Sequence, residues 1–111
     1  MVEGSALRRN VAASLLIVGD ELEALPERAR GEDSEGSWWG GEWMANMGRF
    51  EWLAELAKQG TLDTSEMARY RKLLQLLYRH YALTLHLDLP IPELVLREAE
   101  HLVGKPLDRA A

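Results

Sequence analysis

The chain has 111 residues, a length that suits one domain with a modest core and is short for two. Apolar residues make up 47% and charged residues 28%, the balance of a folded globular domain, which excludes wholesale disorder. The absence of cysteine excludes disulfide frameworks, thiolate zinc sites and cysteine nucleophiles. The formal net charge of −5 disfavours non-specific binding to a phosphate backbone.

The longest apolar stretch, residues 11–18, is much shorter than the roughly 20 residues that span a bilayer, so we expect no membrane partner. Arg8 and Arg9 precede this stretch, as basic residues do in a secretory signal. However, acidic residues follow it at once, and its helical spacing continues through them to Leu25. We therefore expect a cytoplasmic protein.

The first predicted helix covers residues 6–25. Leu16 and Ile17 lie off its main apolar face, so the middle of this helix is apolar on more than one side. This pattern predicts either a central helix or a contact with a second copy, with Leu16 and Ile17 as the self-association residues. Pro26 ends the helix or begins a short extra turn. The main face, at spacings of three and four, consists of Leu7, Val11, Leu15, Val18, Leu22 and Leu25.

Residues 27–41 are rich in glycine and have no apolar period, which predicts an irregular surface loop. The glycines match neither a phosphate-binding loop nor a dinucleotide-binding motif. Tryptophans gather in and just after this loop. They either cap one end of the domain or form an aromatic platform for a ligand or partner, and both interpretations stay open. The candidate contact residues are Trp38, Trp39, Trp43, Met44 and Met47.

A second helix is predicted over residues 42–59, with Gly60 in the left-handed position that follows many helices. The start of the third helix has a specific signal. Asp63 is placed to cap its first turn, and Glu66, three residues later, completes a capping box.

The third helix is predicted to run over residues 64–88, because Pro90 disfavours helical geometry just before it. At about 24 residues it is the longest predicted helix, roughly 36 Å. A last helix is predicted over residues 93–103, with a frayed tail over 104–111. No alternating apolar run predicts a strand. We therefore expect an all-α chain, a single-domain antiparallel bundle of about four helices over residues 1–111.

Catalytic and metal-binding patterns are not found. His80, His86 and His101 lack the spacing of helical metal ligands, and the carboxylate–imidazole pair of Glu98 and His101 occurs once where a di-metal bundle needs it twice. None of the serines lies in a sequence context that activates a nucleophile. The sequence thus predicts no catalytic residue, no metal and no cofactor, and leans against an enzyme.

Basic residues and tyrosines alternate on the third predicted helix, which raises a weaker hypothesis of a nucleic-acid-associated accessory protein. Nucleic acid remains an unlikely partner, because the basic residues are few and two of the tyrosines fall on the buried face. The basic residues are Arg69, Arg71, Lys72 and Arg79, and the tyrosines are Tyr70, Tyr78 and Tyr81.

The leading functional hypothesis is a non-catalytic helical interaction module that assembles through apolar helix faces, as a homodimer. The alternative is a binding protein for an apolar small molecule or a protein partner, with a site lined by the tryptophans and methionines above.

Overall fold

A computed structural model describes residues 2–31 and 40–108, and within these ranges the chain is all-helical, which confirms the predicted fold class. None of the helices in the described ranges is long and apolar enough to cross a bilayer. In chain order the helices are α1 (Val2–Glu23), α2 (Leu25–Gly31), α3 (Gly40–Lys58), α4 (Thr64–Arg79), α5 (Tyr81–His86) and α6 (Glu93–Val103).

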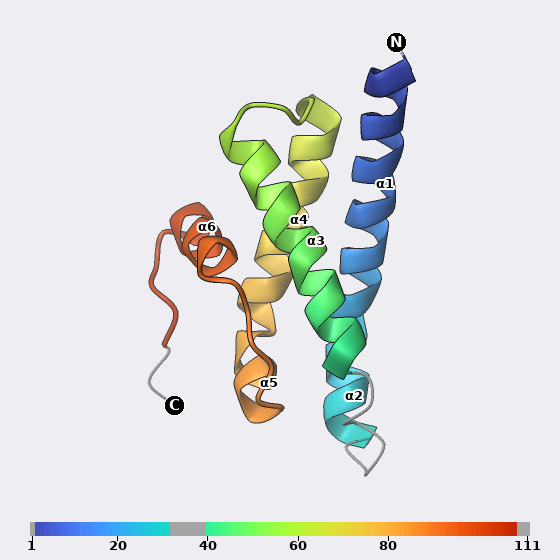
Figure 1. Cartoon of the computed structure of the whole chain (residues 1–111). Helices are drawn as coiled ribbons and strands as arrows, with labels where there is room; N and C mark the ends of the chain where they lie inside the picture. Colours follow the sequence, from blue (N-terminus) through green and yellow to red (C-terminus); the bar gives the residue numbers. More distant parts are fainter. Residues whose placement is uncertain (1, 32–39, 109–111) are drawn as a thin grey trace.

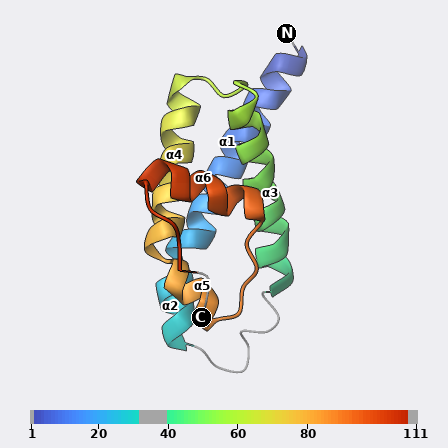
Figure 2. The same cartoon turned by 90° about the vertical axis from the view of Figure 1, so that its left-hand side faces the viewer.

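Three helices form the body of the molecule. α1 and α4 run in the same direction and α3 runs antiparallel to them (Figure 1), and α1 packs against both α3 and α4. The last helix, α6, lies across α3 and α4 instead of along them (Figure 2). The arrangement therefore differs from the predicted antiparallel four-helix bundle. The longest helix is α1 with 22 residues, whereas α4 has 16, so the prediction that the third helix is longest was wrong.

The long third helix of the prediction is broken at His80. Its N–H still donates to the carbonyls of Leu76 and Leu77, at 3.0 and 3.2 Å, but its φ and ψ of −101° and 14° leave the helical region. Beyond the break, the buried hydroxyl of Thr84 donates to the Tyr81 carbonyl at 2.6 Å. The apolar spacing continues through this point without glycine or proline, so the sequence carries no local signal for the break.

Part of the predicted irregular loop over residues 27–41 is helical. Pro26 has no N–H to donate to the Leu22 carbonyl, and the chain changes from α1 to α2 at this point. The N–H of Arg28 then donates to the Ala24 carbonyl at 3.0 Å, so helical bonding resumes within one turn. Residues 32–39 lie outside the described residues, and with them the predicted contact residues Trp38 and Trp39.

The start of α4 confirms the capping box. The N–H of Glu66 donates to Asp63 Oδ1 at 2.8 Å, and the N–H of Asp63 donates to Glu66 Oε1 at 2.9 Å. Arg8 of α1 also reaches this site, where it donates to Glu66 Oε1 and, at 3.0 Å, to the Thr61 carbonyl. The same side chain of Glu66 thus caps α4 and ties it to α1.

The core lies where α1, α3 and α4 meet, and α6 covers it with Val95 and Ala99. The segment after α6 is held in place as far as Leu107, whose N–H donates to Glu100 Oε2 at 2.7 Å. This bond lies within residues 104–111, which were predicted as a frayed tail, and residues 109–111 lie outside the described residues. The fully buried larger side chains include Val11, Val18, Leu22, Leu25, Trp43, Phe50, Leu53, Tyr70, Leu77 and Val95.

Candidate interaction surfaces

The outer face of α1 carries two exposed apolar side chains. Leu16 is 60% exposed and Ile17 is 38% exposed. They lie on the side of the helix opposite Val11 and Val18, which are fully buried against α3 and α4. The two positions that the sequence singled out for self-association are therefore at the surface and outside the core.

Small and charged residues complete this face. Ala12 and Ala13 are exposed one turn before Leu16 and Ile17. Arg9 is exposed toward the start of the helix, and Asp20 and Glu23 are exposed toward its end. We call the surface formed by residues 9, 12, 13, 16, 17, 20 and 23 the outer face of α1. Its first half is basic and its second half is acidic.

The basic flank of α4 lies beside the acidic end of α1. Asp20 and Glu23 line one side of a groove of about 270 Å³, and Arg69 and Lys72 line the other. These basic residues therefore have acidic neighbours in the same molecule, which weakens their attraction to phosphates. Tyr70 is 1% exposed and cannot stack on a base. This arrangement disfavours the nucleic-acid hypothesis.

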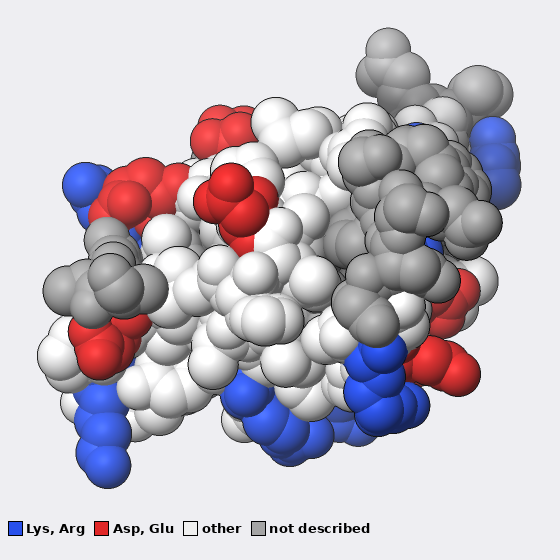
Figure 3. All heavy atoms as spheres, turned by 90° about the horizontal axis from the view of Figure 1, so that it is seen from below, with Lys and Arg blue, Asp and Glu red and all other residues white. Residues whose placement is uncertain are grey.

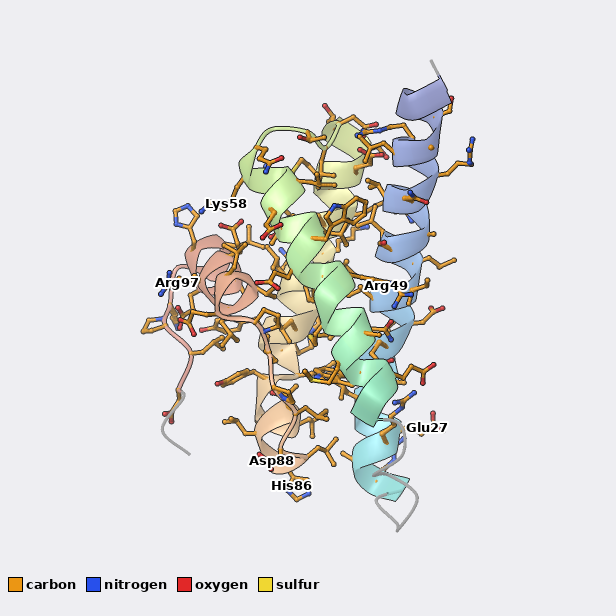
Figure 4. The ribbon with its side chains drawn as sticks, viewed as in Figure 1. Glu27, Arg49, Lys58, His86, Asp88 and Arg97 are labelled. Atoms are coloured by element: carbon orange, nitrogen blue, oxygen red, sulfur yellow. The ribbon has the colours of Figure 1, made fainter. Side chains whose placement is uncertain are left out.

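A buried polar cluster lies on the other side of α1. Glu21 is 5% exposed, and its carboxylate accepts hydrogen bonds from Asn46 Nδ2 at 2.7 Å and Arg28 Nη1 at 3.2 Å. Arg49, labelled on α3 in Figure 4, donates to Asn46 Oδ1 at 2.8 Å. The sequence analysis missed this cluster. Glu21 follows Val18 by three residues, which places it near the buried face of α1. An acidic residue at such a position could have indicated a buried polar cluster.

An apolar groove of about 390 Å³ separates α3 from the extended segment that leads into α6. Met47 forms its base at 2% exposure, and Met44 stands at its rim at 56% exposure. Trp43 lies beneath, fully buried, with its indole N–H donating to the Pro90 carbonyl at 2.7 Å. Of the predicted contact residues, Met44 and Met47 thus line a groove together, whereas Trp43 supports one of its walls. The lining residues are Met44, Met47, Gly48, Glu51, Pro90, Ile91 and Pro92.

The lower end of the molecule carries few charged side chains over part of its surface. Seen from below, a broad area of uncharged side chains is bordered by acidic and basic ones (Figure 3). Residues 81–87, which include α5, contain no Asp, Glu, Lys or Arg. His86 and Asp88 project from this end of α5 (Figure 4).

The described histidines do not form a metal-binding cluster with acidic residues. Among residues 2–31 and 40–108, no group of three or more His, Asp or Glu side chains is placed to hold a metal ion. Comparison with protein-family models, with curated proteins and with solved structures finds no match to this chain.

Proposed function

We propose that this protein is a non-catalytic helical assembly module that forms a homodimer through the outer face of α1. The observation that carries the proposal is the exposure of Leu16 and Ile17 on α1, the longest of the described helices. As the sequence leads us to expect, we place this assembly in the cytoplasm.

The size of the exposed face sets the expected strength of the dimer. Burying a leucine or isoleucine side chain fully contributes about 1.5–3 kcal/mol, and association costs at least about 4 kcal/mol in lost translational and rotational freedom. Because Leu16 and Ile17 are already partly covered in the monomer, the apolar gain from the two copies is of about the same size as this cost. We therefore expect a weak dimer, with a dissociation constant of about 100 μM.

The test is the mass of the protein in solution, measured by sedimentation equilibrium from about 1 to about 200 μM, a range that brackets the expected dissociation constant. Wild-type protein should shift from monomer to dimer, and L16E should remain a monomer with unchanged helical circular dichroism. V103E is the matched control, because Val103 is 41% exposed on α6, away from the outer face of α1. A wild-type monomer throughout the range, or equal effects of L16E and V103E, would contradict the proposal.

A second candidate function is the binding of an apolar small molecule in the groove lined by Met44 and Met47. The observation in its favour is the exposure of Met44 over a concave apolar surface whose volume falls within the range of ligand pockets. Methyl-labelled methionine gives a direct test with an uncharged naphthalene-based probe. The Met44 and Met47 methyl resonances should shift on titration, whereas that of Met67, which lies in α4, should not.

A further inference from the structure

We propose that the two copies meet with their α1 helices antiparallel, so that Arg9 of each copy lies opposite Glu23 of the other. This inference rests on the proposed homodimer and specifies how its partner is seated. It is drawn from the positions and charges of the outer face of α1.

Arg9 and Glu23 of this face are placed symmetrically about Leu16. Arg9, Ala13, Leu16, Asp20 and Glu23 follow one another at alternating spacings of four and three, which keeps them on one side of the helix. Arg9 precedes Leu16 by seven residues and Glu23 follows it by seven, a distance of about 10.5 Å along the axis in each direction. A twofold axis through Leu16 therefore brings position 9 of one copy opposite position 23 of the other.

The charges on this face favour the antiparallel orientation. In an antiparallel pair the basic half of each helix faces the acidic half of its partner, which places unlike charges together twice. In a parallel pair Arg9 would face Arg9 and Glu23 would face Glu23, so both contacts would be repulsive. None of the ion pairs found among the described residues involves Arg9, Asp20 or Glu23. Asp20 and Glu23 share a groove with Arg69 and Lys72 of the same molecule, so the dimer contact adds Arg9 of the partner to this set of charges.

Arg8 and Arg9 are adjacent in the chain but face different surroundings. Arg8 turns toward α4 and bonds to Glu66 and Thr61, whereas Arg9 remains exposed. The exposed side chains of Ala12 and Ala13 are short enough to let a second helix approach. Leu16 of the partner can then pack beside its own counterpart at the centre of the contact.

Charge exchange tests the orientation. Each of R9E and E23R creates two like-charge contacts in the antiparallel dimer, so each should raise the dissociation constant several-fold at low salt. The double variant R9E/E23R exchanges the charges and should return the dissociation constant to near the wild-type value. R71E is the control for net charge, because Arg71 is exposed on α4 and outside the outer face of α1, and it should have little effect. If the double variant has a dissociation constant as high as those of the single variants, the proposed pairing is overturned.

Cross-linking tests the register independently. The chain contains no cysteine, so each introduced cysteine is the sole reactive thiol. A mixture of R9C and E23C treated with a short bismaleimide should give the mixed dimer, whereas R9C alone should not cross-link, since its two copies lie about 21 Å apart along the axis. Efficient cross-linking of R9C with itself would indicate a parallel pair.

The two proposals fail in different ways. If wild-type protein is a monomer, the proposed function fails and this inference fails with it. If wild-type protein is a dimer that L16E dissociates, but R9C cross-links to itself, the proposed function stands and only the antiparallel pairing is overturned.

Discussion

The indole nitrogen of Trp43 on α3 lies 2.7 Å from the carbonyl oxygen of Pro90, to which its N–H donates a hydrogen bond. The two residues are 47 positions apart in the chain. Trp43 is fully buried, and Pro90 belongs to the segment that leads from α5 into α6. This hydrogen bond therefore holds the segment between α5 and α6 against α3. The same segment forms one wall of the apolar groove.

Replacing Trp43 with phenylalanine should lower the free energy of unfolding by about 2–3 kcal/mol, because the Pro90 carbonyl loses its donor and the core loses volume. Urea denaturation followed by circular dichroism measures this change. W52F is the matched control, since Trp52 is only partly buried and its indole makes no hydrogen bond to the part of the chain that the structure describes. Losses of equal size in the two variants would show that the hydrogen bond to Pro90 contributes nothing beyond ring burial.

The capping box gives a second prediction. D63A removes the oxygen that accepts from the Glu66 N–H, and we expect the free energy of unfolding to fall by about 1 kcal/mol. T64A changes an exposed neighbour at the start of α4 and should alter stability by less than about 0.5 kcal/mol. Thermal or urea unfolding of both variants measures these changes. A D63A variant with the same free energy of unfolding as wild type would contradict the capping role of Asp63.

Helix boundaries were predictable where short-range chemistry determines them. The last helix was predicted over residues 93–103, and α6 has these bounds because Pro92 precedes it and Gly104 follows it with a φ of 86°. The capping box likewise identified the start of α4. In both places, a few adjacent residues carry the whole signal.

The parts that could not be predicted depend on contacts between distant segments. The break at His80 and the crossing of α6 over α3 and α4 leave the local apolar spacing unchanged, so the sequence pattern is the same with or without them. At the candidate sites, the spacing of apolar residues along α1 predicted that Leu16 and Ile17 lie off its buried face. The groove was predicted only by its α3 side, since Pro90 and Ile91 reach it from the far end of the chain.

The buried carboxylate of Glu21 leads to a third prediction. E21A leaves Asn46 without its acceptor and takes from Arg28 the carboxylate it contacts, so we expect a loss of about 2–3 kcal/mol in the free energy of unfolding. E21Q retains an oxygen that can accept from Asn46 and should cost about 1 kcal/mol. The control is E55A, at an exposed position of α3, which should stay within about 0.5 kcal/mol of wild type. If E21A is as stable as E55A, the cluster does not hold α2 and α3 to α1.

The last prediction concerns the pH dependence of stability and rests on Tyr70. Its side chain is 1% exposed, and its hydroxyl donates to Glu98 Oε1 at 3.3 Å. Burial raises the pKa of this hydroxyl above its ordinary value of about 10, and the Glu98 carboxylate raises it further by its negative charge and by accepting the hydrogen bond. The folded protein therefore keeps this proton at a pH where the unfolded chain releases it.

The direction of the effect follows from this difference. Below a pH of about 10 the hydroxyl is protonated in both states, and its contribution to stability is complete. As the pH rises beyond that value the unfolded state binds fewer protons, so the free energy of unfolding falls by up to about 1.4 kcal/mol per pH unit. Urea denaturation between pH 8 and pH 11 should show a smaller loss in Y70F than in wild type, while Y78F, whose hydroxyl is at the exposed contact with Lys105, should follow wild type. An alkaline loss in Y70F as steep as that of wild type would show that another group is responsible for it.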